Sequence, residues 1–335
     1  MSLLAVALLA WFLRGVNLAD VLTRLRSADW RFLVLALAAA PLTYVTRAIR
    51  WQYLLAPIGP TRFALVLRAT VIGFAALAVL PARVGDVLRP YMLAREEGIS
   101  VSATFATVVM ERVLDLIAVL ALLAVFVWGF ADAETIPPRL LTPIEVSAGI
   151  AAVVAVALVG LMWVMASSPD RIAVVVLALA RVLPSRFATT LSGFARTFSG
   201  GFAATRDLRG LALAVMWSVP IWVVISVEAW AVTRAFGISM PLTGAYLLQG
   251  LLVIGVAVPT PGGVGSFHEA YRIGVTTFFR APNDRAVAAA IVLHVVSFVP
   301  VVIAGAVLMA REGWNAERIK ALASSAGSTE GAVLR

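Results

Sequence analysis

The stretch that decides the fold of this chain is PTPGGVGSFHEAYR, residues 259–272. It follows the apolar run LLVIGVAV directly, and a second apolar run occupies 286–310. Two prolines and three glycines stand at its start, and His268, Glu269 and Arg272 follow them. Proline removes a helix hydrogen bond and glycine weakens a helix. The stretch therefore predicts a helix that breaks between two apolar segments.

The rest of the chain is also strongly apolar. Of its 335 residues 61% are hydrophobic and 13% are charged, with a mean hydropathy of +0.97, whereas soluble domains carry about 25% charged residues. A helix of about 20 apolar residues crosses the hydrocarbon core of a membrane. The chain repeats such runs and so is predicted to be an all-α polytopic membrane protein; the runs lie at 32–45, 63–80, 113–130, 146–165, 211–233, 242–258 and 286–310.

Composition also limits the chemistry. The chain has no cysteine and two histidines, so we expect no disulfide, no metal and no cofactor. Its net charge is +9, and all but one of its basic residues are arginines. These arginines flank apolar segments, where arginine sets topology and contacts lipid headgroups. We therefore expect membrane lipids, and not nucleic acid, as partners.

Arginine also predicts the orientation. Segment 166–210 has six arginines and two acids, whereas 129–143 has one arginine and two acids. The positive-inside rule places the first segment in the cytoplasm and the second outside. The expected location is the bacterial cytoplasmic (inner) membrane, crossed several times, with the C-terminus in the cytoplasm.

In this topology two segments enter the membrane and return to the same side. Segment 63–98 starts and ends inside, and 242–285 starts and ends outside. Each contains the pattern P-x-x-V-G, PARVG at 81–85 (the first break) and PGGVG at 261–265 (the second break). Opposite orientation and a shared pattern predict an inverted-topology repeat with two re-entrant broken-helix hairpins, whose ends meet near the bilayer midplane.

This repeat divides the chain into two membrane halves. The predicted units are 1–165, with a re-entrant hairpin near 63–98; 166–210, as cytoplasmic interfacial helices or a linker; 211–310, with a re-entrant hairpin near 242–284; and 311–335, a cytoplasmic tail.

Both breaks have features that attract anions. Glycine allows close approach to backbone amides, and Ser266 is expected to cap a half-helix beginning at Phe267. The amide end of such a helix favours phosphate. Arg83 and Arg89 give the first hairpin a similar preference, because guanidinium groups suit phosphate oxygens.

Charged residues also lie within an apolar helix, in TFATVVMERVLDLIAVLALL. Glu111 and Asp115 share a face of this helix, and Arg112 points elsewhere. Charges at such depth line a pathway or form structural pairs. The sequence leaves both readings open, including an ion pair from Arg112 to a hairpin acid such as Asp86 or Glu269.

Other polar residues in apolar surroundings raise the same question. Glu228 is an isolated acid, and we expect His294 to be a hydrogen-bonded core histidine. In TRAIRWQYLL, we expect Arg47, Arg50 and Trp51 to anchor the end of a helix at the membrane interface.

Four motifs together resemble the flippase-like transmembrane family typified by the membrane domain of lysylphosphatidylglycerol synthase. They are the RxxRW element; LPARVGDVLRPYML, close to P-x-R-x-G-E-x-x-R; VVMERVLDL, close to E-R-x-x-D; and PTPGGVGSFHEA, close to P-x-P-G-G-x-G-x-x-E. The resemblance implies a lipid translocase fold whose cargo is a phospholipid or a lipid-linked sugar. Asp86 stands where the family more often has glutamate. This difference shortens the side chain and keeps its negative charge.

The resemblance also implies a set of headgroup-binding residues. The matching positions, completed by Ser266 and Arg272, are Arg83, Gly85, Asp86, Arg89, Glu111, Arg112, Asp115, Pro261, Gly262, Gly263, Gly265, Ser266, Glu269 and Arg272. The aminoacyl-transferring members carry a soluble domain after the membrane part, and this sequence stops soon after its last helix. We therefore expect a transporter and no aminoacyl-transferase activity.

The sequence favours a flippase-like or scramblase-like translocase of an anionic phospholipid or lipid-linked sugar. It has no P-loop, so movement would be passive or coupled to protons through Glu111, Asp115, Glu269 or Glu228. Two alternatives stay open: an accessory subunit of an envelope-lipid biosynthetic enzyme, and an intramembrane enzyme using Glu269 beside His268. Whether the chain forms a homo-oligomer also stays open.

Overall fold

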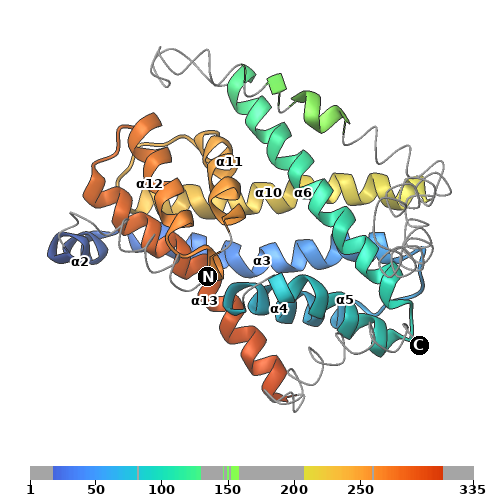
Figure 1. The fold of residues 1–335 in the computed structure, drawn as a ribbon. Helices are drawn as coiled ribbons and strands as arrows, with labels where there is room; N and C mark the ends of the chain where they lie inside the picture. Colours follow the sequence, from blue (N-terminus) through green and yellow to red (C-terminus); the bar gives the residue numbers. More distant parts are fainter. Residues whose placement is uncertain are drawn as a thin grey trace, which may run out of the picture.

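The computed structural model describes residues 18–80, 83–129, 146, 149–150, 152–157, 207–258 and 260–311 (Figure 1). Every labelled element within them is a helix. In chain order these are α2 (Leu18–Ser27), α3 (Trp30–Leu55), α4 (Phe63–Val79), α5 (Val84–Glu97), α6 (Val101–Gly129), α10 (Leu208–Ala235), α11 (Gly244–Ala257), the 3-10 turn η3 (Pro261–Gly263), α12 (Ser266–Phe278) and α13 (Asn283–Arg311). Nearly all of the predicted cytoplasmic segment 166–210 and tail 311–335 lies outside the described residues.

Among the described residues, three helices are long and apolar enough to cross a membrane. They are α3, residues Arg209–Ala235 of α10, and α13. Helices α4 and α11 are equally apolar but shorter, with 17 and 14 residues, or about 25 and 21 Å at 1.5 Å per residue. The predicted class, an all-helical membrane protein, is confirmed.

Helices α3 and α10 run antiparallel along the centre of the molecule (Figure 1). At one end the backbone N–H of Asp29, just before α3, donates to the carbonyl of Ala235 at 2.9 Å. At the other end Gly210 lies against the carbonyl of Tyr53, where a Cβ would be 3.3 Å from that oxygen. The pair is therefore in contact along its whole length.

Each central helix is followed by a hairpin and a long helix. Helices α4 and α5 pack together across the first break and lead into α6, and α11 and α12 pack together across the second break and lead into α13. A glycine closes each hairpin. A Cβ on Gly85 would lie 2.0 Å from the carbonyl oxygen of Gly73, and one on Gly255 would lie 2.9 Å from that of Ser266.

The first group of helices, α3 to α6, packs against the second group, α10 to α13, through their hairpins. Helix α4 of the first hairpin packs on α13 of the second group, where Gly305 meets Ala75, and α11 of the second hairpin packs on α6 of the first. Small residues let membrane helices approach this closely. As a result the second break reaches the end of α4, where a Cβ on Gly262 would be 2.8 Å from the carbonyl oxygen of Ala78. The two breaks therefore lie close together inside the molecule.

The start of α12 differs from the sequence prediction. We expected Ser266 to cap a helix beginning at Phe267, but α12 begins at Ser266 and its N-cap is Gly265. Gly265 has φ 86, a conformation that favours glycine. The Ser266 hydroxyl therefore turns back and donates to the carbonyl of Gly263 at 3.3 Å.

Candidate functional site

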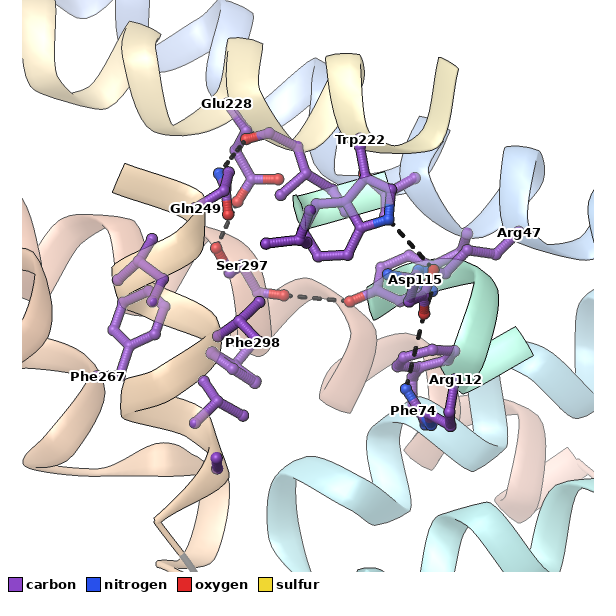
Figure 2. Close-up of a pocket in the computed structure, with 18 of the residues that line it drawn as sticks. Arg47, Phe74, Arg112, Asp115, Trp222, Glu228, Gln249, Phe267, Ser297 and Phe298 are labelled. Atoms are coloured by element: carbon purple, nitrogen blue, oxygen red, sulfur yellow. Dashed lines mark hydrogen bonds and ion pairs between the residues drawn. The ribbon is translucent and has the colours of Figure 1, made fainter. Parts of the chain in front are cut away.

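A cavity of about 370 Å³ opens between the two groups of helices (Figure 2). Its walls come from α3, α4, α6, α10, α11, α12 and α13, and from Arg83 at the first break. A second cavity of about 290 Å³ shares Tyr44, Phe74, Arg83 and Arg112 with it and is also lined by Gly262 and Gly263. Both breaks thus border this space.

An inner ion-pair network is formed by Arg50, Arg89, Glu111 and Asp115, and of these four residues Asp115 also lines the cavity. Arg50 Nη1 lies 2.8 Å from Asp115 Oδ1, and its Nη2 lies 3.5 Å from Glu111 Oε1. Arg89 Nη1 lies 2.8 Å from Glu111 Oε2, and the Arg89 guanidinium stacks 3.6 Å above the Trp51 ring. The side chains of both arginines are at most 4% exposed. Buried charges of this kind must be paired, so the network holds α3, α5 and α6 together.

Three outer arginines, Arg47, Arg83 and Arg112, line the cavity itself. Arg47 Nη1 lies 2.9 Å from Asp115 Oδ2, and Arg83 Nε lies 3.0 Å from Asp86 Oδ2. Arg112 pairs with the other oxygen of Asp86. Of the two acids that the sequence offered to Arg112, the structure selects Asp86.

The combined cluster carries more positive than negative charge. Five arginines of the inner network and the outer set share three carboxylates, those of Asp86, Glu111 and Asp115. Within the part of the chain that the structure describes, two positive charges of this cluster are therefore left without a carboxylate. The exposed fractions of the Arg83 and Arg112 side chains are 58% and 34%, so both are accessible from the cavity.

Arg83 has an unusual backbone conformation. Its φ is 56, in the left-handed region that residues with a Cβ rarely adopt. The position that aligns with it in the second break is Gly263, with φ 70. Holding a non-glycine residue there costs on the order of 1 kcal/mol. Arg83 is therefore kept at this position against a local conformational cost.

The opposite end of the cavity is formed by Glu228, Gln249 and Ser297 (Figure 2). The Ser297 hydroxyl donates to Glu228 Oε1, and Tyr44 donates to the Ser297 carbonyl at 3.2 Å. Gln249 donates to the carbonyl of Ile225 at 3.1 Å. Aromatic residues also line the cavity, among them Phe74, Trp222 and Phe298. Phe74 belongs to the arginine end, where the Arg47 guanidinium lies 5.0 Å from the centre of its ring.

The charged residues of α12 lie outside both cavities. Glu269 pairs with Arg272 on its own helix, with Arg272 Nε 2.8 Å from Glu269 Oε2. Arg272 Nη1 also donates to Asn283 at 3.1 Å. The structure therefore does not bring these two predicted site residues to the arginine cluster. Pro261 is a further predicted site residue, and its side chain is not among the parts that the structure describes.

The two histidines stack on each other between α12 and α13. The ring centroids of His268 and His294 are 4.6 Å apart. The Nδ1 atom of His268 accepts the N–H of Gly265 at 3.3 Å, but Nδ1 of His294 is buried and has no hydrogen-bond partner among the described residues. The expected hydrogen bond of His294 is therefore absent at Nδ1, and the ring packs against His268 and Phe298.

Arg47, Arg50 and Trp51 are placed differently from the sequence expectation. They were expected at the membrane interface, but Arg50 and Trp51 are both 0% exposed and Arg47 lines the cavity. The acids of α6 provide the reason, since they pair with both arginines inside the protein. The RxxRW element is therefore an interior element.

Several cavity residues were missed from the sequence, namely Tyr44, Phe74, Trp222, Gln249 and Ser297. Gln249 and Ser297 carried a signal, because each is a polar residue within an apolar run. The aromatic residues carried none, since aromatic residues are common throughout membrane helices.

Comparison with known proteins places the chain among membrane proteins. Residues 1–305 match the family model described as the lysylphosphatidylglycerol synthase TM region. A curated relative, Glycosyltransferase AglD of Haloferax volcanii, is 26% identical over 331 residues, covering 91% of this chain and 52% of the relative. The chain therefore spans about half the length of the curated relative that it matches.

Proposed function

The chain belongs to the lysylphosphatidylglycerol synthase transmembrane family, and we propose that it is a lipid translocase that moves an anionic headgroup between the two leaflets. The phosphate of the lipid headgroup binds at the outer arginines, Arg47, Arg83 and Arg112, inside the cavity between the two groups of helices. The acyl chains stay in the lipid alongside.

One observation carries this proposal: among the described residues, the five arginines of the inner network and the outer set share three carboxylates, which leaves two positive charges in the cluster beside the cavity. A charge inside a membrane is costly unless it is paired. A phosphate group supplies the missing negative charge, and the forked guanidinium group suits its oxygens. The arginine end therefore lowers the cost of taking a phosphate through the hydrocarbon layer.

The proposed transport path is an inverted-topology repeat with two re-entrant hairpins. Helices α3, α4, α5 and α6 correspond in order to α10, α11, α12 and α13. When each helix is replaced by its counterpart, every main packing pair becomes another pair that is also present; for example, α4 with α13 becomes α11 with α6. The central helices α3 and α10 are antiparallel, as such an inversion requires. The short lengths of α4 and α11 suit arms that reach only partway across the bilayer.

Two alternatives are weaker. For an intramembrane enzyme, Glu269 would have to reach a substrate, but it pairs with Arg272 away from both cavities. For an accessory subunit, support comes from AglD, which is named a glycosyltransferase and is about twice as long as the region matched. In that case the chain would hold a lipid substrate for an enzyme without moving it.

The test is lipid exchange in liposomes that contain the purified protein. The lipid is phosphatidylglycerol with a fluorescent label on an acyl chain. Dithionite reduces the label only in the outer leaflet, so a loss of the fluorescence protected in the inner leaflet reports exchange of the lipid between leaflets. Wild type should exchange the lipid faster than protein-free liposomes, and Arg83→Ala should lose most of this gain. Arg95→Ala is the matched control, because Arg95 is an exposed arginine at the other end of α5. No exchange by the folded wild type would favour the accessory role.

A further inference from the structure

The two ends of the 370 Å³ cavity differ in charge, and this difference points to a class of headgroup. Figure 2 shows Arg47, Arg112 and Asp115 on one side and Glu228, Gln249 and Ser297 on the other. Along α10, Glu228 lies six residues beyond Trp222, whose indole N–H donates to Asp115 at 3.2 Å. Six residues correspond to about 9 Å of helix.

Glu228 has no positive partner in the part of the chain that the structure describes. It is 5% exposed and lies in the cavity wall. Its Oε1 accepts a hydrogen bond from Ser297, but Oε2 accepts none from the described residues. By contrast, Glu111 and Asp115 each pair with arginines. A buried carboxylate that faces a cavity without a counter-charge is a site for a cation.

The neighbours of Glu228 suit an ammonium group. The side-chain N–H of Gln249 donates to the carbonyl of Ile225, and the side-chain amide oxygen of Gln249 accepts no hydrogen bond from the described residues. The aromatic rings of Tyr44, Trp222 and Phe298 also line the cavity, and such rings attract ammonium through their faces. Oxygen acceptors combined with aromatic walls favour a primary amine, whose N–H groups they can satisfy.

We propose that the cavity selects a zwitterionic headgroup of the phosphoethanolamine type, with its phosphate at Arg47, Arg83 and Arg112 and its primary ammonium at Glu228. This inference rests on the proposed function: it keeps the phosphate site, and it replaces a headgroup of net negative charge by one whose phosphate is balanced by an ammonium group. The cavity volume lies within the range of roughly 300–1,000 Å³ found for small-molecule sites. The headgroup neutralises Glu228 and leaves the arginine pairs intact.

The test compares three lipids with the same labelled acyl chain: phosphatidylethanolamine, its N-acetyl derivative and phosphatidylglycerol. The N-acetyl derivative keeps the phosphate and loses the ammonium. Wild type should exchange phosphatidylethanolamine at least about tenfold faster than the other two, since a hydrogen bond to a charged group provides that difference. Glu228→Gln should lose this preference and keep the slower exchange, which also shows that the variant is folded. Glu269→Gln, the matched control, should keep the preference.

Two results would overturn the inference: equal rates for all three lipids in wild type, or a Glu228→Gln variant slowed equally for all three. A second measurement separates this inference from the proposed function. The purified protein is titrated with soluble glycerophosphoethanolamine and glycerophosphoglycerol. Preferential binding of the first, lost in Glu228→Gln, would support the amine site even if no lipid were exchanged. Equal binding of both would overturn the amine site while leaving the translocase intact.

Discussion

At the positions aligned by P-x-x-V-G, the first break has Arg83 where the second has Gly263, and Asp86 where the second has Ser266. Both breaks have a residue in the left-handed conformation, but only the first places a charged side chain there. Arg83 lines both cavities and pairs with Asp86. Gly263 lines the second cavity with backbone alone. The first break therefore provides charge.

The second break provides close packing. Gly262 leaves no room for a side chain, because a Cβ there would lie 2.8 Å from the carbonyl oxygen of Ala78 at the end of α4, and the Ser266 hydroxyl donates to Gly263 in its own turn. The charged pair of α12, Glu269 and Arg272, lies outside the cavities. The same backbone pattern thus has two uses, and substitutions at matched positions should affect stability and transport differently.

The largest expected effect on stability is at Glu111, which belongs to the first hairpin's network. Glu111→Gln leaves Arg89 without its carboxylate, and removing one partner of a buried ion pair costs about 3–5 kcal/mol. We expect a large fall in the unfolding temperature in detergent, or no folded protein. Glu269→Gln is the control on the second hairpin, where the partly exposed pair contributes about 1 kcal/mol or less. Equal losses in the two variants would show that the hairpins do not differ in this way.

The next effect is at Gly262, where conformation and contact both oppose a side chain. A Cβ there meets the Ala78 carbonyl at 2.8 Å, and φ is 60. Gly98→Ala is the control, because Gly98 has φ 67 but nothing within 4 Å of its Cβ position. Gly98→Ala should cost about 1 kcal/mol, and Gly262→Ala should cost about 1 kcal/mol more, from the close contact. If thermal unfolding shows equal losses, the second break does not pack tightly on α4.

A smaller effect is expected at Ser266. Ser266→Ala removes the hydrogen bond to the Gly263 carbonyl and a long one to the Thr260 hydroxyl, each contributing about 0.5–1.5 kcal/mol or less. Since neither cavity is lined by Ser266, the variant should exchange lipid at the wild-type rate in the liposome assay. Loss of exchange without loss of stability would assign headgroup binding to the second break as well.

The sequence predicted the helical membrane class from the repeated apolar runs, since their length is set by the bilayer. It also drew attention to Arg112 and Asp115, because charges inside an apolar helix are rare, and to Arg83 at the first break. Asp86 entered as a possible partner of Arg112, and the structure brings these four residues together. Their partners were not predictable in the same way. Arg112 had two acids within its expected reach, and only the packing of α5 on α6 selects Asp86.

The error at Arg50 and Trp51 has a related cause. An arginine and a tryptophan near a helix end are typical of the membrane interface. Whether they face lipid or protein depends on which helix packs beside them, and α6 supplies Asp115 and Thr107 as partners. The grouping of Glu228, Gln249 and Ser297 at one end of the cavity was equally unpredictable, since the three residues come from three different helices.

The most direct measurement of the central claim uses Arg83, where transport and stability should separate. Arg83→Gly removes the cavity charge and relieves the left-handed conformation, so its unfolding temperature should be equal to or above that of wild type. Arg280→Gly is the matched control, because Arg280 also has positive φ, at 52, but lines neither cavity. We expect both variants to be at least as stable as wild type and only Arg83→Gly to lose phosphatidylglycerol exchange in liposomes. A stable Arg83→Gly variant that exchanges lipid as fast as wild type would contradict the claim that charge at the first break moves the headgroup.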